Sequence, residues 1–207
     1  MIIKIKEINQ QQLVNENQIY PVLAYRVNSN QIKEYRIFDE GNSFTWIIDG
    51  VEILSNDESK YYECMVNNEI LYLYNLLDQD FFLNFYLEED DFEGILKQLK
   101  EALKKIVMQD LSTQEIMHAI SQTDVKSDYF PLLIDCFFSI ASITEINENM
   151  RYFATICEQL YENDIKRIVD YVELIDSEEV KYFFECISEC YNISDDLMNQ
   201  VYSYLYK

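Results

Sequence analysis

The sequence predicts an α+β protein: an N-terminal antiparallel β-sheet covered by an amphipathic helix, followed by a C-terminal all-helical bundle. Two changes along the chain support this fold class. Up to residue 87, short apolar runs alternate with polar turn signals, which is typical of strands joined by tight turns. From residue 88 onward, apolar residues recur at spacings of three and four, which is typical of helices.

The strand-like runs are separated by short turn signals. Asp49-Gly50 is the strongest hairpin signal, and Asn67-Asn68 also tolerates the backbone of a tight turn. Because successive turns are so short, we expect one meandering antiparallel sheet. The predicted strands are Ile2 to Ile8, Tyr20 to Val27, Ile32 to Phe38, Phe44 to Ile48, Val51 to Leu54, Tyr61 to Val66, Ile70 to Leu76 and Phe81 to Leu87.

The helical part begins with one apolar stripe between Phe92 and Val107, which we expect to cover one face of the sheet. Ser112 and Glu115 have the spacing of a capping box. The run from Tyr129 to Ile143 is apolar nearly all round and predicts a central buried helix. Three further helices are predicted around Ile165 to Val172, Val180 to Ile187 and Leu197 to Leu205, the last capped by Ser194. No internal repeat is evident.

The chain divides most naturally near residues 109 to 111. This predicts a sheet-plus-helix part at 1–108 and a helical part at 109–207. No Pro-rich or Gly-rich linker separates them, so we expect the two parts to pack as one body.

Cysteine usage and hydropathy predict a cytoplasmic protein. The chain has five cysteines, an odd number, and none is spaced Cys-x-x-Cys, which favours reduced thiols over a disulfide framework. In residues 1–7, charged residues interrupt the apolar ones, whereas a signal peptide has a continuous apolar run, so we expect no signal peptide here. The longest apolar run spans 129–143, shorter than the roughly 20 residues that a bilayer requires.

The net charge restricts the possible partners. The chain carries 38 Asp and Glu against 16 Lys and Arg, a formal charge of −22. Such a body is repelled by nucleic-acid backbones and by anionic membranes, so we expect it to bind neither. The densest basic group is Lys97, Lys100, Lys104 and Lys105. Two glutamates precede members of this group by four residues, as in ordinary intrahelical ion pairs.

Residues with the patterns of catalysis, metal binding or cofactor binding are scarce. His118 is the only histidine and has no flanking signature of a catalytic triad. Cys186 and Cys190 share a helix face, but no histidine lies near them to complete a zinc site. Asp78-Gln79-Asp80 is too short for a calcium loop. The three glycines are isolated, which disfavours a phosphate-binding loop. We therefore expect no catalytic residue, no metal, no cofactor and no enzymatic activity.

The distribution of acids indicates a binding face instead. Residues 37–96 hold fifteen acids and one base, and residues 168–206 hold nine acids and one base. Both stretches are interleaved with tyrosines, which supply large contact areas in protein interfaces. The cluster that we expect to contact a partner is Asp78, Asp80, Glu88, Glu89, Asp90, Asp91, Tyr74 and Tyr86.

In composition the chain resembles the immunity proteins of bacterial polymorphic-toxin and contact-dependent inhibition systems: it is acidic, and rich in Asn, Ile, Tyr and Glu. This resemblance spans the whole chain but is one of type, so it carries over no site residues. It implies a cytosolic antitoxin that covers the basic active site of a cognate toxin, above all a nuclease.

Three alternatives stay open at this point. The first is a non-catalytic adaptor or regulator that binds another protein through its helical half. The second is a nucleic-acid mimic that inhibits a defence nuclease. The third is an enzyme that uses paired carboxylates. The identity and activity of the partner and the oligomeric state do not follow from the sequence.

Overall fold

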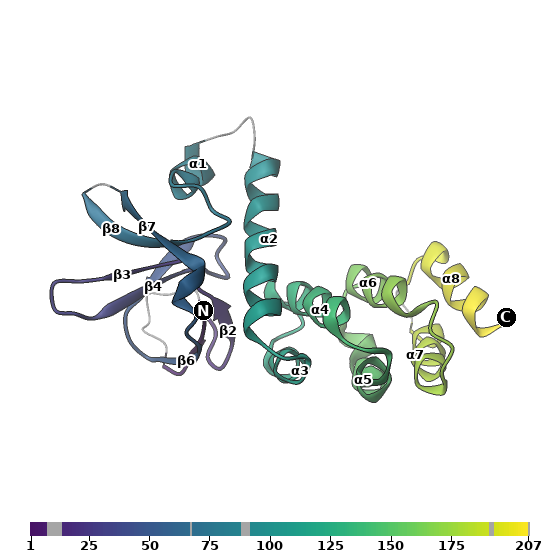
Figure 1. Cartoon of the computed structure of the whole chain (residues 1–207). Coiled ribbons are helices and arrows are strands. Elements are labelled where there is room, and N and C mark those ends of the chain that lie inside the picture. Colours follow the sequence, from purple (N-terminus) through teal and green to yellow (C-terminus); the bar gives the residue numbers. More distant parts are fainter. Residues whose placement is uncertain (8–13, 67, 88–91, 191–192, 207) are drawn as a thin grey trace. The chain divides into compact units, whose positions relative to one another are not determined.

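The computed structural model describes residues 1–7, 14–66, 68–87, 92–190 and 193–206. The protein is α+β, with its strands in the N-terminal part and most of its helices in the C-terminal part (Figure 1). It separates into two compact units, Met1–Ser112 and Thr113–Lys207, which are described one at a time.

The first unit contains two antiparallel sheets rather than the single meander that the turns predict. Their strand orders are β2-β1-β6 and β5-β4-β3-β8-β7, and every described pairing is antiparallel, as expected. The elements are β1 (Ile2–Ile5), β2 (Ile19–Pro21), β3 (Ala24–Val27), β4 (Lys33–Phe38), β5 (Phe44–Ile47), β6 (Val51–Ser55), a short 3₁₀ helix (Glu58–Lys60), β7 (Tyr61–Val66), β8 (Glu69–Tyr74), α1 (Phe81–Leu87) and α2 (Phe92–Asp110).

The predicted strand from Tyr20 to Val27 is divided between the two sheets. β2 ends at Pro21, which has no N–H for a continuing strand ladder. The next two amides point to different sheets, because Val22 donates to the carbonyl of Met1 and Leu23 donates to the carbonyl of Arg36. The chain therefore passes from the smaller sheet to the larger one within two residues.

Asp49-Gly50 forms a turn, but the predicted hairpin is wrong. Gly50 has a φ of +67°, which suits a tight turn, yet β5 pairs with β4 while β6 pairs with β1 in the other sheet. The Gly50 carbonyl accepts hydrogen bonds from the amides of Lys6 and Glu7, and a Cβ at position 50 would lie 2.7 Å from the Glu7 carbonyl oxygen. The local sequence thus specifies the turn, whereas long-range pairing decides the strand partners.

Phe81 to Leu87 is the helix α1, so the predicted last strand is also wrong. The segment is apolar at almost every position, and such a run does not distinguish a strand from a helix by periodicity. The helix begins where the carbonyl of Asp80 accepts hydrogen bonds from the amides of Leu83 and Asn84. In this conformation three phenylalanines, Phe81, Phe82 and Phe85, turn to one side and become buried.

The amphipathic helix α2 packs against β1 and β2, which confirms its predicted role as a cover of a sheet. At its end, the Asp110 carboxylate accepts hydrogen bonds from Lys60 Nζ (2.7 Å) and Ser55 Oγ (2.8 Å) and pairs with the Met1 amino group at 2.5 Å. Burial disfavours the charged form of Asp110, but these donors outweigh it, so the pKa of Asp110 is lowered.

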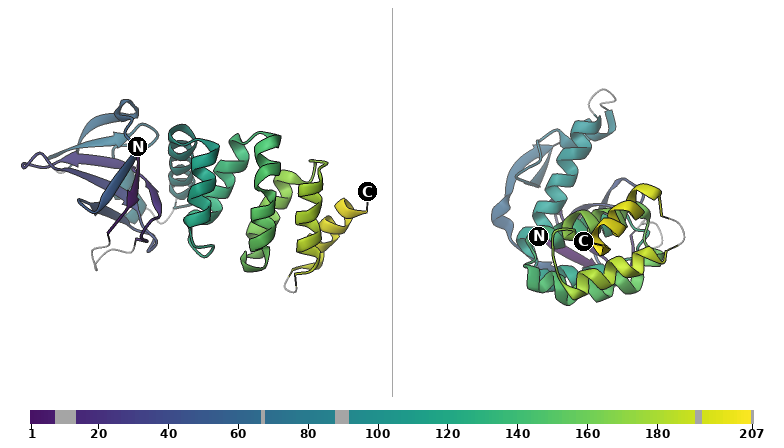
Figure 2. Two further views of the ribbon diagram at one scale, coloured as in Figure 1. Left: turned by 90° about the horizontal axis from the view of Figure 1, so that it is seen from below. Right: turned by 90° about the vertical axis from the view of Figure 1, so that its right-hand side faces the viewer.

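The second unit consists of helices that lie in two rows (Figure 1 and Figure 2). α4 packs on α6 and α5 packs on α7, while α3 pairs with α4 and α7 with α8. This is the packing of stacked helical hairpins, although the sequence shows no repeat. The elements are α3 (Thr113–Gln122), α4 (Tyr129–Ile140), α5 (Ile143–Ile156), a 3₁₀ helix η2 (Cys157–Gln159), α6 (Glu162–Val172), α7 (Glu178–Ser188) and α8 (Asp195–Leu205).

The predicted helix from Tyr129 to Ile143 is in fact α4 and the start of α5. α4 is buried along most of its length, as expected, but ends at Ile140. Ser142 then caps α5 through a capping box with Glu145, and the sequence analysis missed this helix. The predicted N-cap of α8 is confirmed, because the Ser194 side chain accepts a hydrogen bond from the Leu197 amide.

Candidate protein-binding surface

The inner face of α1 is anchored to the larger sheet by aromatic contacts. The ring of Phe44 on β5 lies 4.8 Å from the rings of both Phe82 and Phe85, measured between centroids, in edge-to-face geometry. The hydroxyl of Tyr86 accepts a hydrogen bond from the Phe44 amide over 3.1 Å. These contacts fix how α1 is rotated on the sheet and therefore which of its residues face outward.

One arginine side chain lies against the inner side of the same helix. The guanidinium carbon of Arg36 is 3.8 Å from the centroid of the Phe82 ring and 5.5 Å from that of Trp46. Arg26 lies 4.5 Å from the same tryptophan ring. Arg36 Nε is buried and has no hydrogen-bond partner within the described part of the chain, and burial lowers the pKa of Arg36. Stacking on aromatic rings thus takes the place of a carboxylate partner for this cation.

The outer face of α1 is apolar and exposed. Leu83, Tyr86 and Leu87 retain 58%, 56% and 67% of their accessible surface. Their spacing of three and four residues places them on adjoining positions of the helix surface, and we call these three residues the α1 face. Tyr86 lies at its edge, because its hydroxyl also bonds to the Phe44 amide of the sheet. Large apolar side chains gathered in this way are typical of protein-binding surfaces rather than of ordinary solvent-facing helices.

Acidic side chains lie immediately before α1. Asp78 and Asp80 are exposed, and neither carboxylate forms an ion pair with a Lys or Arg of the described residues. Asp78 has only a long contact of 3.5 Å with Gln98 Nε2. The apolar α1 face therefore has unpaired negative charge at its N-terminal edge, the polar-rim arrangement of many interfaces.

The structure brings together only part of the predicted contact cluster. Asp78, Asp80 and Tyr86 surround or belong to the α1 face. Tyr74 is fully buried in β8, so its ring stabilises the sheet and offers no surface. The acids at 88–91 lie outside the described residues.

The two leucines of the α1 face were missed by the sequence analysis. Leu83 and Leu87 share a face with Tyr86 only if the segment is helical. The signal that could have found them is the i, i+3, i+4 spacing of apolar residues inside a run interpreted as a strand.

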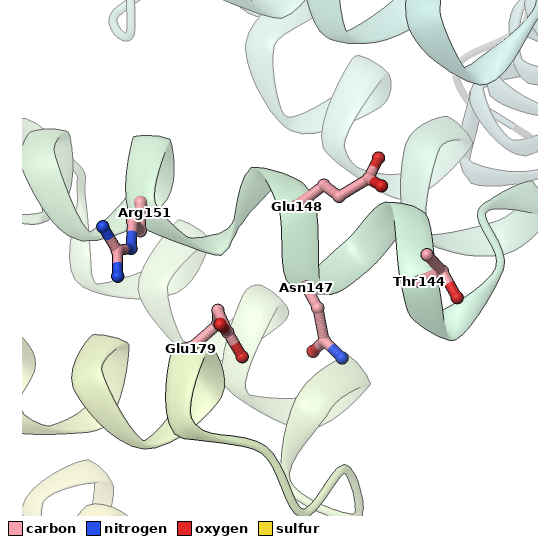
Figure 3. Close-up of a pocket in the computed structure, with 5 residues that line it drawn as sticks. All are labelled: Thr144, Asn147, Glu148, Arg151 and Glu179. Carbon is pink, nitrogen blue, oxygen red and sulfur yellow. The ribbon is translucent and has the colours of Figure 1, made fainter.

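The second unit presents a different feature, an open hollow between α5 and α7 (Figure 3). It has a volume of about 380 Å³ and is lined by Thr144, Asn147, Glu148, Arg151 and Glu179. Asn147 is held by a 2.8 Å hydrogen bond that its Oδ1 accepts from Ser177 Oγ. The charged side chains of the hollow form no ion pair with one another among the described residues, although both signs are present.

Beside the hollow, the solvent-facing stripe of α7 is acidic. Glu178, Tyr182, Glu185 and Glu189 are all exposed and recur at helical spacing, with Tyr182 retaining 50% of its surface. Within the described part of the chain, none of these three glutamates forms an ion pair. This stripe belongs to the second acidic stretch of the sequence, so each unit carries one acidic surface with an exposed tyrosine.

The structure shows the surroundings of the histidine and the five cysteines, the residues that the sequence analysis considered for catalysis or metal binding. His118 lies exposed on α3, and no cysteine hydrogen bonds to its ring in the described structure. All five cysteines are free thiols. No group of three or more His, Cys, Asp or Glu among the described residues is arranged to hold a metal ion.

Comparison with protein-family models, curated proteins and solved structures finds no significant match to this chain. Among the described residues, no helix has both the length and the apolar character needed to cross a bilayer. The class that the fold and surfaces define is therefore a strongly acidic α+β protein with an exposed apolar helix face.

Proposed function

We propose that this protein is an acidic, non-catalytic cytoplasmic inhibitor: an immunity protein that binds the basic active site of a toxin, above all a nuclease, and blocks it. The observation that carries the proposal is the α1 face, an apolar helical surface with the unpaired carboxylates of Asp78 and Asp80 beside it, on a chain of net charge −22. A nuclease cleft is lined with Lys and Arg because it must bind phosphates. Carboxylates compete for those cations.

The two parts of this surface have different roles in the proposed complex. Leu83, Tyr86 and Leu87 supply the desolvated centre, because burying an exposed leucine side chain contributes roughly 1.5–3 kcal/mol. Asp78 and Asp80 steer the encounter, because complementary charge raises association rates at low salt. A short helix that inserts apolar residues at i, i+3 and i+4 is a recurring mode of recognition between proteins.

The test uses the polypeptide encoded beside this gene as the candidate toxin. Binding is measured by surface plasmon resonance, and protection is measured as survival of cells that express the candidate toxin. Leu87→Ser should weaken binding by about 30-fold, the effect of an interface hot spot worth about 2 kcal/mol. Leu174→Ser is the matched control, because Leu174 is even more exposed, at 88%, and lies in the second unit.

The outcomes distinguish the proposal from its alternatives. Loss of binding and protection with Leu87→Ser but not with Leu174→Ser supports it. Binding that survives Leu87→Ser yet fails when Glu185 and Glu189 are reversed would place the interface on α7 and favour an adaptor that binds through its helical unit. A partner that binds tightly without any loss of enzymatic activity would show that the protein is not an inhibitor.

A further inference from the structure

A pair of thiols lies at the junction of η2 and α7 in the second unit. Cys157 is the first residue of η2 and is 4% exposed, whereas Cys190 follows the end of α7 and is partly exposed. Their Sγ atoms are 3.7 Å apart. The Cys190 thiol also donates to the Cys186 carbonyl over 3.4 Å, which holds its side chain in place.

The two sulfurs are in direct contact. An S–S bond is about 2.05 Å long, so the two sulfurs must approach by roughly 1.7 Å. Cys157 lies where α5 passes into η2, and Cys190 lies two residues beyond the end of α7. Cys190 is the more exposed residue of the pair, so we expect its sulfur to react first with an oxidant and the buried Cys157 to react second.

We infer that Cys157 and Cys190 form a redox-responsive pair that closes to an intramolecular disulfide when the protein meets a disulfide oxidant such as oxidised glutathione. In the first step the Cys190 thiolate attacks one sulfur of oxidised glutathione, forming a mixed disulfide and releasing one glutathione thiolate. In the second step the Cys157 thiolate attacks the Cys190 sulfur and releases the second glutathione. The protein loses two electrons and two protons, and one glutathione disulfide becomes two glutathione thiols.

The bond would join positions that are 33 residues apart and would enclose α6 and α7 in a covalent loop. Closing such a loop reduces the freedom of the unfolded chain, so oxidation should raise the thermal midpoint. It would also fix the end of α7 against η2, which continues directly from α5. The two helices that line the hollow would then be tethered to each other.

The environment of the pair makes the reaction slow at neutral pH. Burial raises the pKa of Cys157 to about 12, with further contributions from Cys190, Cys186 and Glu158. Burial also raises the pKa of Cys190, opposed by its contact with Cys157 and reinforced by Glu158, Cys186 and Glu189. Because only the thiolate attacks a disulfide, the rate should rise by up to about tenfold per pH unit below these pKa values.

The experiment incubates the full chain with oxidised glutathione and follows thiol content, intact mass and peptide maps. We expect two of the five thiols to disappear, the mass to fall by two hydrogen atoms, and a peptide that links positions 157 and 190 to appear. Dithiothreitol should restore all five thiols. The closing rate should increase between pH 7 and pH 9.

Matched variants separate this pair from its neighbours. Cys186→Ser removes a thiol one helical turn away and should still form the bond between positions 157 and 190. Cys190→Ser and Cys157→Ser should form no intramolecular disulfide, and Cys157→Ala, an apolar replacement, serves if the serine variant fails to fold. A wild-type protein that stays fully reduced at pH 9, or a map that shows a Cys186–Cys190 bond instead, would overturn the inference.

Discussion

The guanidinium of Arg36 lies 3.8 Å from the ring centroid of Phe82, so a cation on β4 supports the helix that carries the proposed binding face. This contact joins the larger sheet to α1 at a point where Arg36 Nε has no hydrogen-bond partner among the described residues. The flat guanidinium fills space under the ring and keeps its charge near the π-face. Two substitutions of Arg36 can distinguish how much its volume and how much its charge contribute to stability.

Arg36→Ala should lower the free energy of unfolding by about 1–3 kcal/mol, because it leaves a space beneath Phe82. Arg36→Met should remain within about 1 kcal/mol of the wild type, because an unbranched apolar chain fills the space and removes a partly desolvated charge. Urea denaturation followed by tryptophan fluorescence measures both values. Equal destabilisation by the two variants would mean that the cation–π contact, not the volume, holds α1.

Replacing either of two buried aspartates in the second unit by asparagine should change the free energy of unfolding, but in different directions for Asp135 and Asp164. Arg167 Nη1 donates to both carboxylate oxygens of Asp135 at 2.8 Å, whereas its Nε is 3.9 Å from Asp164. Asp135→Asn weakens the close pair and should lower the free energy of unfolding by about 1–3 kcal/mol at pH 7. Asp164→Asn should be neutral or stabilising at this pH.

The pH dependence gives the reason for the Asp164 prediction. Burial raises the pKa of Asp164, with Arg167 opposing and Asp135 adding to the shift. A folded-state pKa above the unfolded value of about 3.9 means that ionisation of Asp164 disfavours folding as pH rises from about 4 through the folded pKa. The gain from Asp164→Asn should therefore disappear below about pH 4. Denaturation curves of both variants between pH 3 and pH 7 test this, and a constant difference would contradict it.

The capping box of α5 should lower the pKa of Glu145, and a titration of this residue can measure the effect. Hydrogen bonds from Thr113 and from the backbone and side chain of Ser142 lower the pKa of Glu145 to about 2. A lowered folded-state pKa contributes stability above the unfolded value of about 4.3, and this stability is lost as pH falls toward 2. NMR titration of the Glu145 carboxyl carbon measures the shift directly.

Ser142→Ala removes the cap of the same helix. It should lower the free energy of unfolding by about 0.5–2 kcal/mol, because the hydroxyl that accepts from the Glu145 amide is lost, and raise the pKa of Glu145, because the same hydroxyl donates to its carboxylate. Ser139→Ala is a suitable control, since the Ser139 hydroxyl donates to the carbonyl of Asp135 within its own helix and has no part in the capping box. An unchanged Glu145 titration in Ser142→Ala would show that the capping box does not set its pKa.

The acids beside α1 should affect association rather than folding. Asp78→Lys with Asp80→Lys should slow binding of the candidate toxin and flatten the dependence of its association rate on salt, because steering is screened within about 8 Å at physiological ionic strength. The free energy of unfolding should fall by no more than about 1 kcal/mol, since both side chains are exposed and only the unfavourable charge at the start of α1 opposes folding. Asp49→Lys is the control, as Asp49 is exposed in the same unit, in the turn between β5 and β6. If Asp49→Lys slows binding equally, the charge of the whole chain, and not this rim, directs the encounter.

Features set by a few neighbouring residues could be predicted from the sequence. The turns at Asn28–Gln31 and Asp49-Gly50 and the cap at Ser194 depend on local chemistry, and each appears in the structure. The order of strands first and helices afterwards is also confirmed, but the change comes between Tyr74 and Phe81 and not near residue 88. The net charge of −22 is likewise a property of composition alone. These features depend on interactions within one turn or a few residues, which the sequence displays directly.

Tertiary structure decided the rest. Which strand β5 and β6 each pair with depends on hydrogen bonds to distant segments, so the same Asp49-Gly50 turn connects two sheets instead of forming a hairpin. The run from Phe81 to Leu87 is apolar enough for either structure, and burial of its phenylalanines against Phe44 selects the helix. That selection turns Leu83, Tyr86 and Leu87 to the outside. The proposed binding face exists because long-range packing, not local preference, fixes the orientation of α1.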